Sequence, residues 1–441
     1  MRPKKHIATP FRARLEQILD HSHPLFKLAD QIDWSLFEDA YGATYDDQIG
    51  RLGESIRIMV ALHYLKYTFD FSDEQVVETF LENPYWQYFC GFEYFQHEYP
   101  TDPSNMTRFR KRAGDKGIEK MLEGLIHTAL QMRALKPGYL NKINVDTTVQ
   151  EKAISFPTDA KLYFCMREKL VGLAKDRNIV LRQSYVRLGK QALIKPHAKQ
   201  MKRAKRERKK LKIYLGRVVR DIELKVKCPD PELQHYLKLA HKLLLQTKTS
   251  KNKLYSIHAP EVECISKGKA HKRYEFGVKI GMASTSKGNW IVGIESFPGN
   301  PYDGHTLKET LGSMMQMIGK SAQDVYVDLG YRGHDYRGDA QVHIVNSRKM
   351  RELTRSVRRW YKRRSAIEPI FGHLKSDNRM SKNYLLGRDG DKINAVLCAC
   401  GYNMRKLLTV FLLHDFLYSY FVKINRAVTI NVSTLGYALT G

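Results

Sequence analysis

Hydrophobic residues recur with helical spacing in the first third of the chain and alternate with polar residues further on. Residues 20–135 are predicted to be helical, and one helix face is marked by Ile56, Met59, Val60, His63, Tyr64 and Tyr67. Residues 142–150 instead alternate, with Ile143, Val145, Thr147 and Val149 on one side. This alternation predicts a strand that carries Asp146 on its polar side, where Asp is uncommon. Such an Asp either faces solvent or lines a site.

Strand patterns return after a long helical stretch. Residues 274–283 and 289–295 predict a hairpin that turns at Lys287-Gly288-Asn289, and a helix is expected from Thr306 to about Ile318. Residues 325–328 predict a second strand with Asp328 opposite its apolar side, and residues 342–345 predict a third. In the loop before Thr306, Asp303 and His305 either contact substrate or, more commonly, serve the turn and the cap. Residues 394–413 predict an apolar helix packed on the core.

The segment 360–375 predicts a cationic helix with one acidic residue. A buried stripe is formed at helical spacing by Ile367, Ile370, Phe371 and Leu374. At about 100° per residue, the side chains within about 40° of Glu368 are Tyr361, Arg364 and Lys375. The alternative is a capping box from Ser365 to Glu368, favoured by Pro369, which would take Tyr361 and Arg364 off this face. The local pattern leaves both interpretations open.

The charge predicts a polyanionic partner. The 441 residues hold 74 Lys and Arg against 46 Asp and Glu, a net charge of +28, and residues 161–220 hold 20 of these cations but only 3 acids. Residues 103–114 follow a short helix and a turn, as in helix-turn-helix DNA readers. The cations of this helix are Arg108, Arg110, Lys111 and Arg112. We expect them to contact DNA, although a solvated helix face is the commoner explanation of one charge run.

Cysteine spacing and hydropathy indicate a cytoplasmic protein. The six cysteines are scattered without a CxxC pair, so neither a zinc site nor a disulfide framework is expected. No signal peptide is expected from the first residues. The longest apolar stretch, 407–422, is interrupted by His414 and Asp415, so we expect no membrane span.

Three acids recur on a strand, a second strand and a helix: Asp146, Asp328 and Glu368. Hard divalent cations prefer carboxylate oxygens, and two ions ~4 Å apart can clamp both oxygens of a displacement at phosphorus. This order predicts an α/β fold with a ribonuclease H-like mixed sheet. The expected parts are an all-α N-terminal DNA-binding domain at 1–135, a catalytic core at 136–160 and 256–377, a basic helical insertion at 161–255, and a C-terminal helical region and tail at 378–441.

At these residues the chain resembles a DDE transposase of the bacterial insertion-sequence family five group. The signature Tyr-(2)-Arg-(3)-Glu-(6)-Lys is matched by Tyr361, Arg364, Glu368 and Lys375. The two aspartate motifs are similar to Val145-Asp146-Thr147-Thr148 and to Asp328-Leu329-Gly330-Tyr331-Arg332-Gly333. Residues 267–271 and 299–306 also resemble the family, and the resemblance runs from about residue 25 to 412.

The resemblance implies a metal-dependent transposase. Asp146, Asp328 and Glu368 would bind two Mg²⁺ or Mn²⁺ ions, and Tyr361, Arg364, Lys375 and Arg332 would hold DNA near the cut end. The implied reaction is cleavage at the terminal inverted repeats, followed by strand transfer of the freed 3′-OH into target DNA by a homodimer that pairs two ends. One alternative is a catalytically silent DNA-binding protein on the same fold, a repressor or an architectural factor. Another is a general nuclease, which would leave the basic N-terminal helices unexplained.

Overall fold

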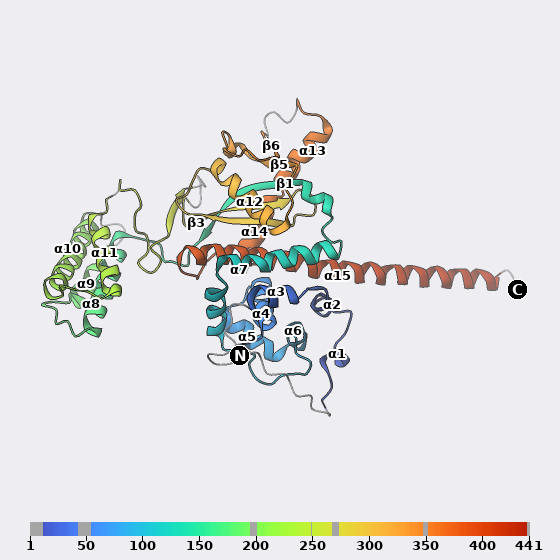
Figure 1. Ribbon diagram of the computed structural model, residues 1–441, viewed down its shortest axis with the longest axis horizontal. Helices are drawn as coiled ribbons and strands as arrows, with labels where there is room; N and C mark the ends of the chain where they lie inside the picture. The colour runs from blue at the N-terminus through green and yellow to red at the C-terminus, as the bar shows by residue number, and fades with distance from the viewer. Residues whose placement is uncertain are drawn as a thin grey trace.

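A computed structural model describes residues 12–42, 54–194, 201–247, 249–266, 273–346 and 352–438, with side chains as far as residue 412. Figure 1 shows a sheet with its helices, a group of N-terminal helices below it, and a separate helical module to one side. The long last helix passes between the sheet and the N-terminal helices and continues beyond them. The family-like residues 267–271 lie outside the described ranges.

The N-terminal part is built from helices, as predicted. They are α1 (Leu15–Ile18), α2 (Pro24–Gln31), α3 (Ser35–Gly42), α4 (Ile56–Phe69), α5 (Asp73–Glu82), α6 (Pro84–Phe89) and α7 (Pro103–Gln131). Their starts follow local chemistry: Ser72 and Gln75 form a capping box at α5, and Pro occupies the first turn of α2, α6 and α7. Within α7 the backbone leaves helical geometry at Gly114, where φ is +64°. The basic half of α7 therefore ends in a kink.

The sheet has six strands in the described part of the chain. They are β1 (Lys142–Glu151), β2 (Glu263–Ser266), β3 (Tyr274–Thr285), β4 (Ile291–Phe297), β5 (Asp324–Val327) and β6 (Gln341–Ile344). The order is β2-β3-β1-β5-β6, and β4 also pairs with β3. β3 runs antiparallel to β1, β2 and β4, whereas β1, β5 and β6 are mutually parallel. The predicted strands and hairpin are confirmed, and Gly288 and Asn289 both take positive φ in its turn.

Helices cover the sheet and close the core. The short helices η1 (Pro137–Asn141), η2 (Asp303–Thr306) and η3 (Leu329–Tyr331) connect strands, and α12 (Leu307–Ile318) packs on β3 and β4. After β6 follow α13 (Arg355–Arg364), α14 (Ile367–Ser376) and α15 (Gly387–Ala438). One continuous core joins the sheet, α12, α14 and α15 to the N-terminal helices. The site on the sheet is thus carried by a single packed body.

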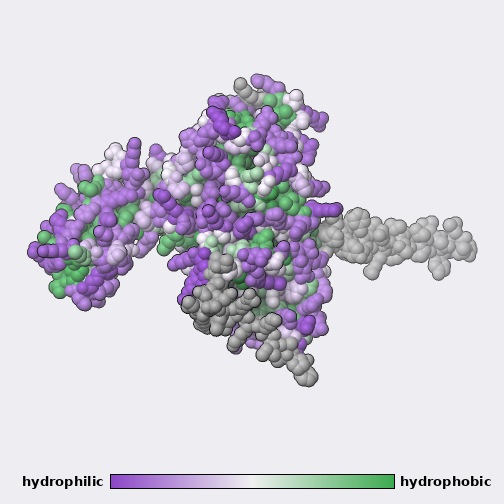
Figure 2. Space-filling model, viewed as in Figure 1, coloured by the Kyte–Doolittle hydropathy of each residue, from purple (hydrophilic) through white to green (hydrophobic). Residues whose placement is uncertain are grey.

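The helical module lies between β1 and β2. It consists of α8 (Asp159–Asp176), α9 (Val186–Ile194), α10 (Met201–Lys225) and α11 (Pro231–Leu245). Its apolar side chains form a core separate from that of the sheet, with Leu170, Leu215, Ile222 and Leu243 fully buried. Residues 152–158 and 246–262 connect it to the sheet, and Figure 2 shows its surface as largely hydrophilic.

The first half of α15 is a buried helix. Val396, Leu397, Cys398, Cys400 and Met404 are fully buried, and α15 packs against α7, α4 and β4. Among the described residues, 387–412 form one helix whose length and apolar composition would suffice to cross a membrane, but 61% of its apolar window is buried inside the protein. A core helix of a soluble protein has the same properties. The predicted packing of residues 394–413 on the core is confirmed up to residue 408.

Candidate active site

The strand register places Asp146 and Asp328 side by side. In the parallel pair of β1 and β5, Lys142 lies opposite Asp324 and Asn144 lies opposite Tyr326. The same offset carries Asp146 to Asp328, the first residue after β5. The backbone N–H of Gly330 donates to Asp328 Oδ1 at 2.9 Å and so fixes this carboxylate at the strand end. Two aspartates far apart in sequence therefore meet at one edge of the sheet.

The guanidinium of Arg364 contacts both aspartates and Glu368. Its Nη2 lies 2.5 Å from Asp146 Oδ2 and 3.6 Å from Asp328 Oδ2, and its Nη1 lies 3.5 Å from Glu368 Oε1. Because both aspartate oxygens lie so near one nitrogen, they are no more than about 6 Å apart. The three predicted acids thus surround one cationic group that is itself only 13% exposed.

Hydrogen bonds from β1 fix the end of α13 that carries Arg364. The buried Asn144 donates from Nδ2 to the carbonyl oxygen of Arg363 at 3.0 Å and accepts from the Ser286 hydroxyl at 2.7 Å. Arg363 in turn donates to the carbonyl of Ser286 at 3.1 Å. Arg364 follows directly in sequence, and so its side chain is delivered to Asp146, two residues beyond Asn144.

The segment 360–375 forms two helices and not one. α13 ends at Arg364, and α14 begins at Ile367 with Ala366 as its N-cap. The Ser365 hydroxyl donates to the carbonyl of Lys362 at 2.7 Å, so the alternative of a capping box between Ser365 and Glu368 is wrong. The predicted stripe of α14 is confirmed, with Ile367, Ile370 and Leu374 buried and Phe371 half-buried.

A fourth carboxylate, Asp303, lies beside the two aspartates. Its Oδ1 accepts from the Thr147 hydroxyl at 3.0 Å and pairs with Lys279 Nζ at 2.9 Å. Gly330 lies between the carboxylates, because a Cβ at this position would meet Asp328 Oδ1 at 3.0 Å and Asp303 Oδ2 at 3.3 Å. The sequence favoured a turn role for Asp303, since nothing local to the loop shows that it faces β1.

A buried tyrosine lies beneath the acids. Tyr331 is fully buried, and burial raises the pKa of its phenol well above the ordinary value, with a further contribution from the Asp146 carboxylate. The phenol therefore stays neutral at any working pH. It closes the base of the site without adding charge to it.

The other residues predicted to hold DNA near the acids are spread along the sheet. The Tyr361 ring stands edge-on to Tyr326, with ring centroids 6.1 Å apart, near the end of β5. Arg332 is exposed in the loop after η3. Lys375 Nζ lies 3.9 Å from Glu275 Oε1 on β3. Asp146 lies opposite Met282 on the same strand, and seven residues of strand from Glu275 to Met282 span roughly 20 Å. The expected common face therefore does not bring the Lys375 ammonium to the acids.

The basic half of α7 presents three of its four cations. Arg108, Lys111 and Arg112 are exposed. The expected DNA contact of Arg110 is corrected by the structure. Arg110 is 4% exposed, and its guanidinium donates to both carboxylate oxygens of Asp73 at 2.9 and 2.7 Å. Its position on the inner face of α7 commits it to the core, so it is not available to DNA.

The acids suit divalent cations if Arg364 moves away. They supply carboxylate oxygens, the donors that Mg²⁺ and Mn²⁺ prefer. In this arrangement the guanidinium stands among those oxygens in the place of a cation, and no three His, Cys, Asp or Glu side chains in the described ranges converge to hold a metal directly. Gly330 leaves the space in which Asp328 and Asp303 approach each other. These carboxylates therefore fit divalent cations, and the Arg364 guanidinium has to move out before the cations can bind.

Comparison with known proteins gives three results. Residues 13–112 match the family model described as Transposase domain (DUF772), and residues 246–404 match the one described as Transposase DDE domain. The chain is also similar to the uncharacterized protein ORF8 in the nfe locus of Rhizobium meliloti, at 49% identity over 194 residues, which are 43% of this chain and 93% of that protein. No solved structure matches the chain.

Proposed function

Because the chain belongs to the insertion-sequence type of DDE transposases, we propose that Asp146, Asp328 and Glu368 are its catalytic acids. They would support cleavage of DNA at the terminal inverted repeats and strand transfer into target DNA. One observation carries the proposal: all three carboxylates lie within 3.6 Å of the Arg364 guanidinium, although they come from two strands and a helix. Acids on adjacent strands and a following helix also support a ribonuclease H-like sheet.

The carboxylates act first by holding cations next to a scissile phosphate. Members of the family use divalent metal ions in general, and we propose two Mg²⁺ or Mn²⁺ ions at Asp146, Asp328 and Glu368. Such ions would stabilise the charge that develops on the attacking and leaving oxygens. Lys279 and Thr147 hold Asp303 against this cluster, and Tyr331 closes its base. Arg364, once released from the acids, is placed to neutralise a phosphate.

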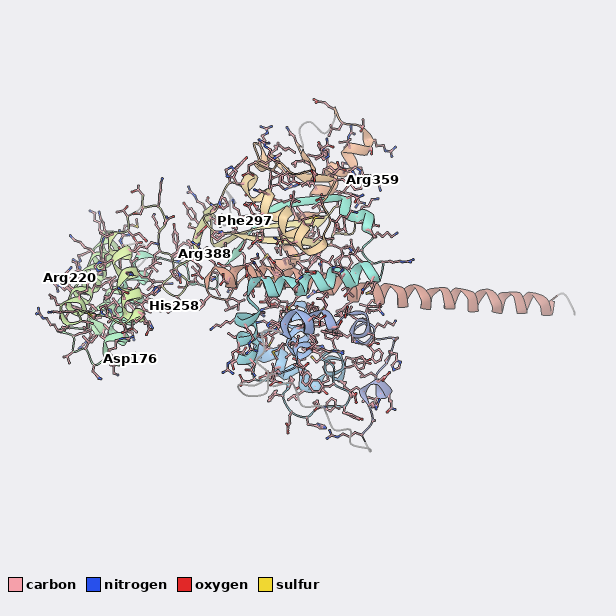
Figure 3. All side chains as sticks on the ribbon, viewed as in Figure 1. Asp176, Arg220, His258, Phe297, Arg359 and Arg388 are labelled. Carbon is pink, nitrogen blue, oxygen red and sulfur yellow. The ribbon has the colours of Figure 1, made fainter. Side chains whose placement is uncertain are left out.

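The surface around α13 supports contact with DNA. Six of its ten residues are cations, and a groove of about 880 Å³ follows this helix, lined by Arg355, Arg358, Arg359, Lys362 and Arg363. Figure 3 shows Arg359 at this edge of the sheet, apart from the labelled residues of the helical module. A run of cations beside the acids would bind the phosphate backbone. Tyr361 belongs to the same helix, Arg332 follows η3 four residues after Asp328, and Lys375 lies beside Glu275 further along the sheet.

DNA and a second copy of the chain are the proposed partners. The exposed Arg108, Lys111 and Arg112 would recognise the transposon end through the basic half of α7. Pairing two ends requires two active sites, and we propose a homodimer in the cytoplasm, associated with the nucleoid. Membership of the family five group is proposed on the Tyr361, Arg364, Glu368 and Lys375 signature.

Cleavage of labelled DNA tests the function. The substrate is a duplex from the inverted repeats that flank the gene, incubated with the full chain with and without Mg²⁺. We expect strand cleavage that requires Mg²⁺ and is lost in Asp146→Ala, Asp328→Ala and Glu368→Ala, while each variant binds the duplex nearly as well as the parent.

The control is Asp339→Ala, which removes an exposed acid outside the cluster. It should cleave at the parental rate. Undiminished cleavage by Asp146→Ala would overturn the assignment. Duplex binding without Mg²⁺-dependent cleavage by the parent would instead favour a silent DNA-binding protein.

A further inference from the structure

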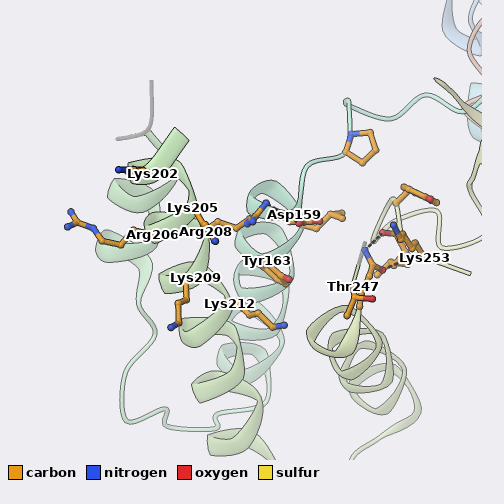
Figure 4. A pocket seen from close by; sticks show the side chains of 15 residues that line it. Asp159, Tyr163, Lys202, Lys205, Arg206, Arg208, Lys209, Lys212, Thr247 and Lys253 are labelled. Carbon is orange, nitrogen blue, oxygen red and sulfur yellow. Dashed lines mark hydrogen bonds and ion pairs between the residues drawn. The ribbon is translucent and has the colours of Figure 1, made fainter. Parts of the chain in front are cut away.

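The helical module contains a hollow lined by cations, away from the acids. Its volume is about 680 Å³, and it lies between α8, α10 and the segment that follows α11. Figure 4 shows the cationic side chains of α10 on one side, Tyr163 at the back and Lys253 across the opening. Seven lining residues are basic: Lys202, Lys205, Arg206, Arg208, Lys209, Lys212 and Lys253.

Little negative charge balances this hollow. Asp159 is the single acid among the lining residues that the structure describes, and it lies 3.5 Å from Arg208. Lys202, Lys205, Lys209 and Lys212 form no ion pair within the described ranges. At helical spacing these four lysines occupy one stripe of α10, within about 80° of one another. Like charges that stand together without partners favour the binding of a polyanion.

The length of the stripe matches an extended ligand. From Lys202 to Lys212 the helix rises about 15 Å, which is about four base pairs of DNA axis. A small anion would need only two or three convergent donors. A row of four lysines instead matches the regularly repeated negative charges of a phosphate backbone.

The hollow lies at the end of the module that is connected to the sheet. Its lining includes Pro157 from the segment that leaves β1, and Gln246, Thr247, Lys253, Leu254 and Tyr255 from the segment that returns to the sheet. From Asp146 to Asp159 the chain has thirteen steps and spans at most about 45 Å. A turn of duplex DNA is about 34 Å long. One duplex can therefore reach both the acids and the hollow.

We propose that this hollow binds the phosphate backbone of duplex DNA, within about one and a half helical turns of the bond at the acid site. That this duplex is a transposon end rests on the proposed function. That the hollow binds duplex DNA does not depend on the proposed function. The module would then act as a second clamp on the DNA end. It would hold the duplex in line with the acids without reading its sequence.

The test measures the salt dependence of duplex binding. A fluorescent 30-base-pair duplex of arbitrary sequence is titrated with the full chain in EDTA, between 50 and 200 mM KCl. The variant carries Lys202→Gln, Lys205→Gln, Lys209→Gln and Lys212→Gln, since Gln keeps good helix propensity. Loss of four phosphate contacts should make the slope of log K against log salt shallower by about 3 to 4, and binding at 50 mM should fall by about 100-fold or more.

A matched variant removes the same charge elsewhere on the module. It carries Lys175→Gln, Lys190→Gln, Lys227→Gln and Lys238→Gln, at exposed lysines that do not line the hollow. Its slope should stay near the parental value. Equal losses in both variants, or an unchanged slope in the first, would each overturn the proposal. Because no cleavage is measured, failure of the proposed catalysis would leave this result interpretable.

Discussion

Arg364 Nη2 lies 2.5 Å from Asp146 Oδ2, although 218 residues separate the two along the chain. The same guanidinium lies near Asp328 and Glu368. Arginine was expected to hold DNA, yet here it neutralises the acids that are proposed to bind cations. We infer that Arg364 and divalent cations compete for the same oxygens, and that cation binding releases Arg364 towards a phosphate.

Replacing this arginine should strengthen cation binding while weakening catalysis. A charge-assisted hydrogen bond contributes about 1.5–3 kcal/mol, so Arg364→Gln should bind Mn²⁺ about 10- to 100-fold more tightly than the parent in the absence of DNA. The same variant should cleave DNA poorly, because a phosphate ligand is lost. Isothermal titration with Mn²⁺ measures the first effect. Unchanged or weaker Mn²⁺ binding would show that Arg364 does not compete with the ion.

Gly330 should tolerate no side chain if the carboxylates need their present spacing. In Gly330→Ala, the new Cβ would meet Asp328 Oδ1 at 3.0 Å and Asp303 Oδ2 at 3.3 Å, so both groups must shift by a few tenths of an ångström. Such displacements at a reacting centre can reduce the rate by about 10- to 100-fold. Single-turnover cleavage rates measure this. Gly312→Ala, where a Cβ meets nothing within 4 Å, is the control and should keep the parental rate.

The strands and the two aspartates could be predicted because their signals are local. Alternation around Asp146 and Asp328 shows on which side of each strand the acids lie, and parallel pairing then sets them level. Arg110 could not be separated from Lys111 in this way, because a helical run of cations does not show which member turns inward to Asp73. For a related reason the sequence favoured a turn role for Asp303 over a place in the site, since its partner Thr147 is 156 residues away.

Removing Asp303 should affect stability as well as activity. Asp303→Asn would leave the buried Lys279 without its carboxylate partner, which costs about 1–3 kcal/mol in the free energy of unfolding. Urea unfolding measures that loss. The double variant Asp303→Asn with Lys279→Met should recover most of it, because no unpaired charge is then buried. If the losses of free energy of unfolding in the single variants Asp303→Asn and Lys279→Met simply add in the double variant, Asp303 and Lys279 do not act as a pair.

The buried histidine of α4 should make stability depend on pH. Burial, helped by the nearby Arg110 charge, lowers the pKa of His63 to about 3. Below pH 6.5 His63 binds a proton in the unfolded chain but stays neutral in the folded protein. The free energy of unfolding therefore falls as the pH falls, by about 1.4 kcal/mol per pH unit. The lowered pKa of Asp73 acts only below its ordinary value of 3.8, outside this window.

Urea unfolding at pH 7.5 and pH 5 checks this expectation. The parent should lose about 2 kcal/mol between the two conditions. His63→Gln should lose less, whereas His127→Gln, at an exposed position, should behave as the parent does. An equal loss in all three proteins would assign the pH dependence to other groups.

Asp146, Asp328 and Glu368 are expected to share bound cations. Fe²⁺ can take the place of Mg²⁺ at oxygen ligands, and with ascorbate and peroxide it cuts the nearby polypeptide, so mass spectrometry of the fragments locates the ion without any DNA. We expect cuts near residues 146, 328 and 368 together, suppressed by excess Mg²⁺ and lost in Asp146→Asn. Cuts confined to one of the three segments, or cuts that persist in Asp146→Asn, would contradict a shared site.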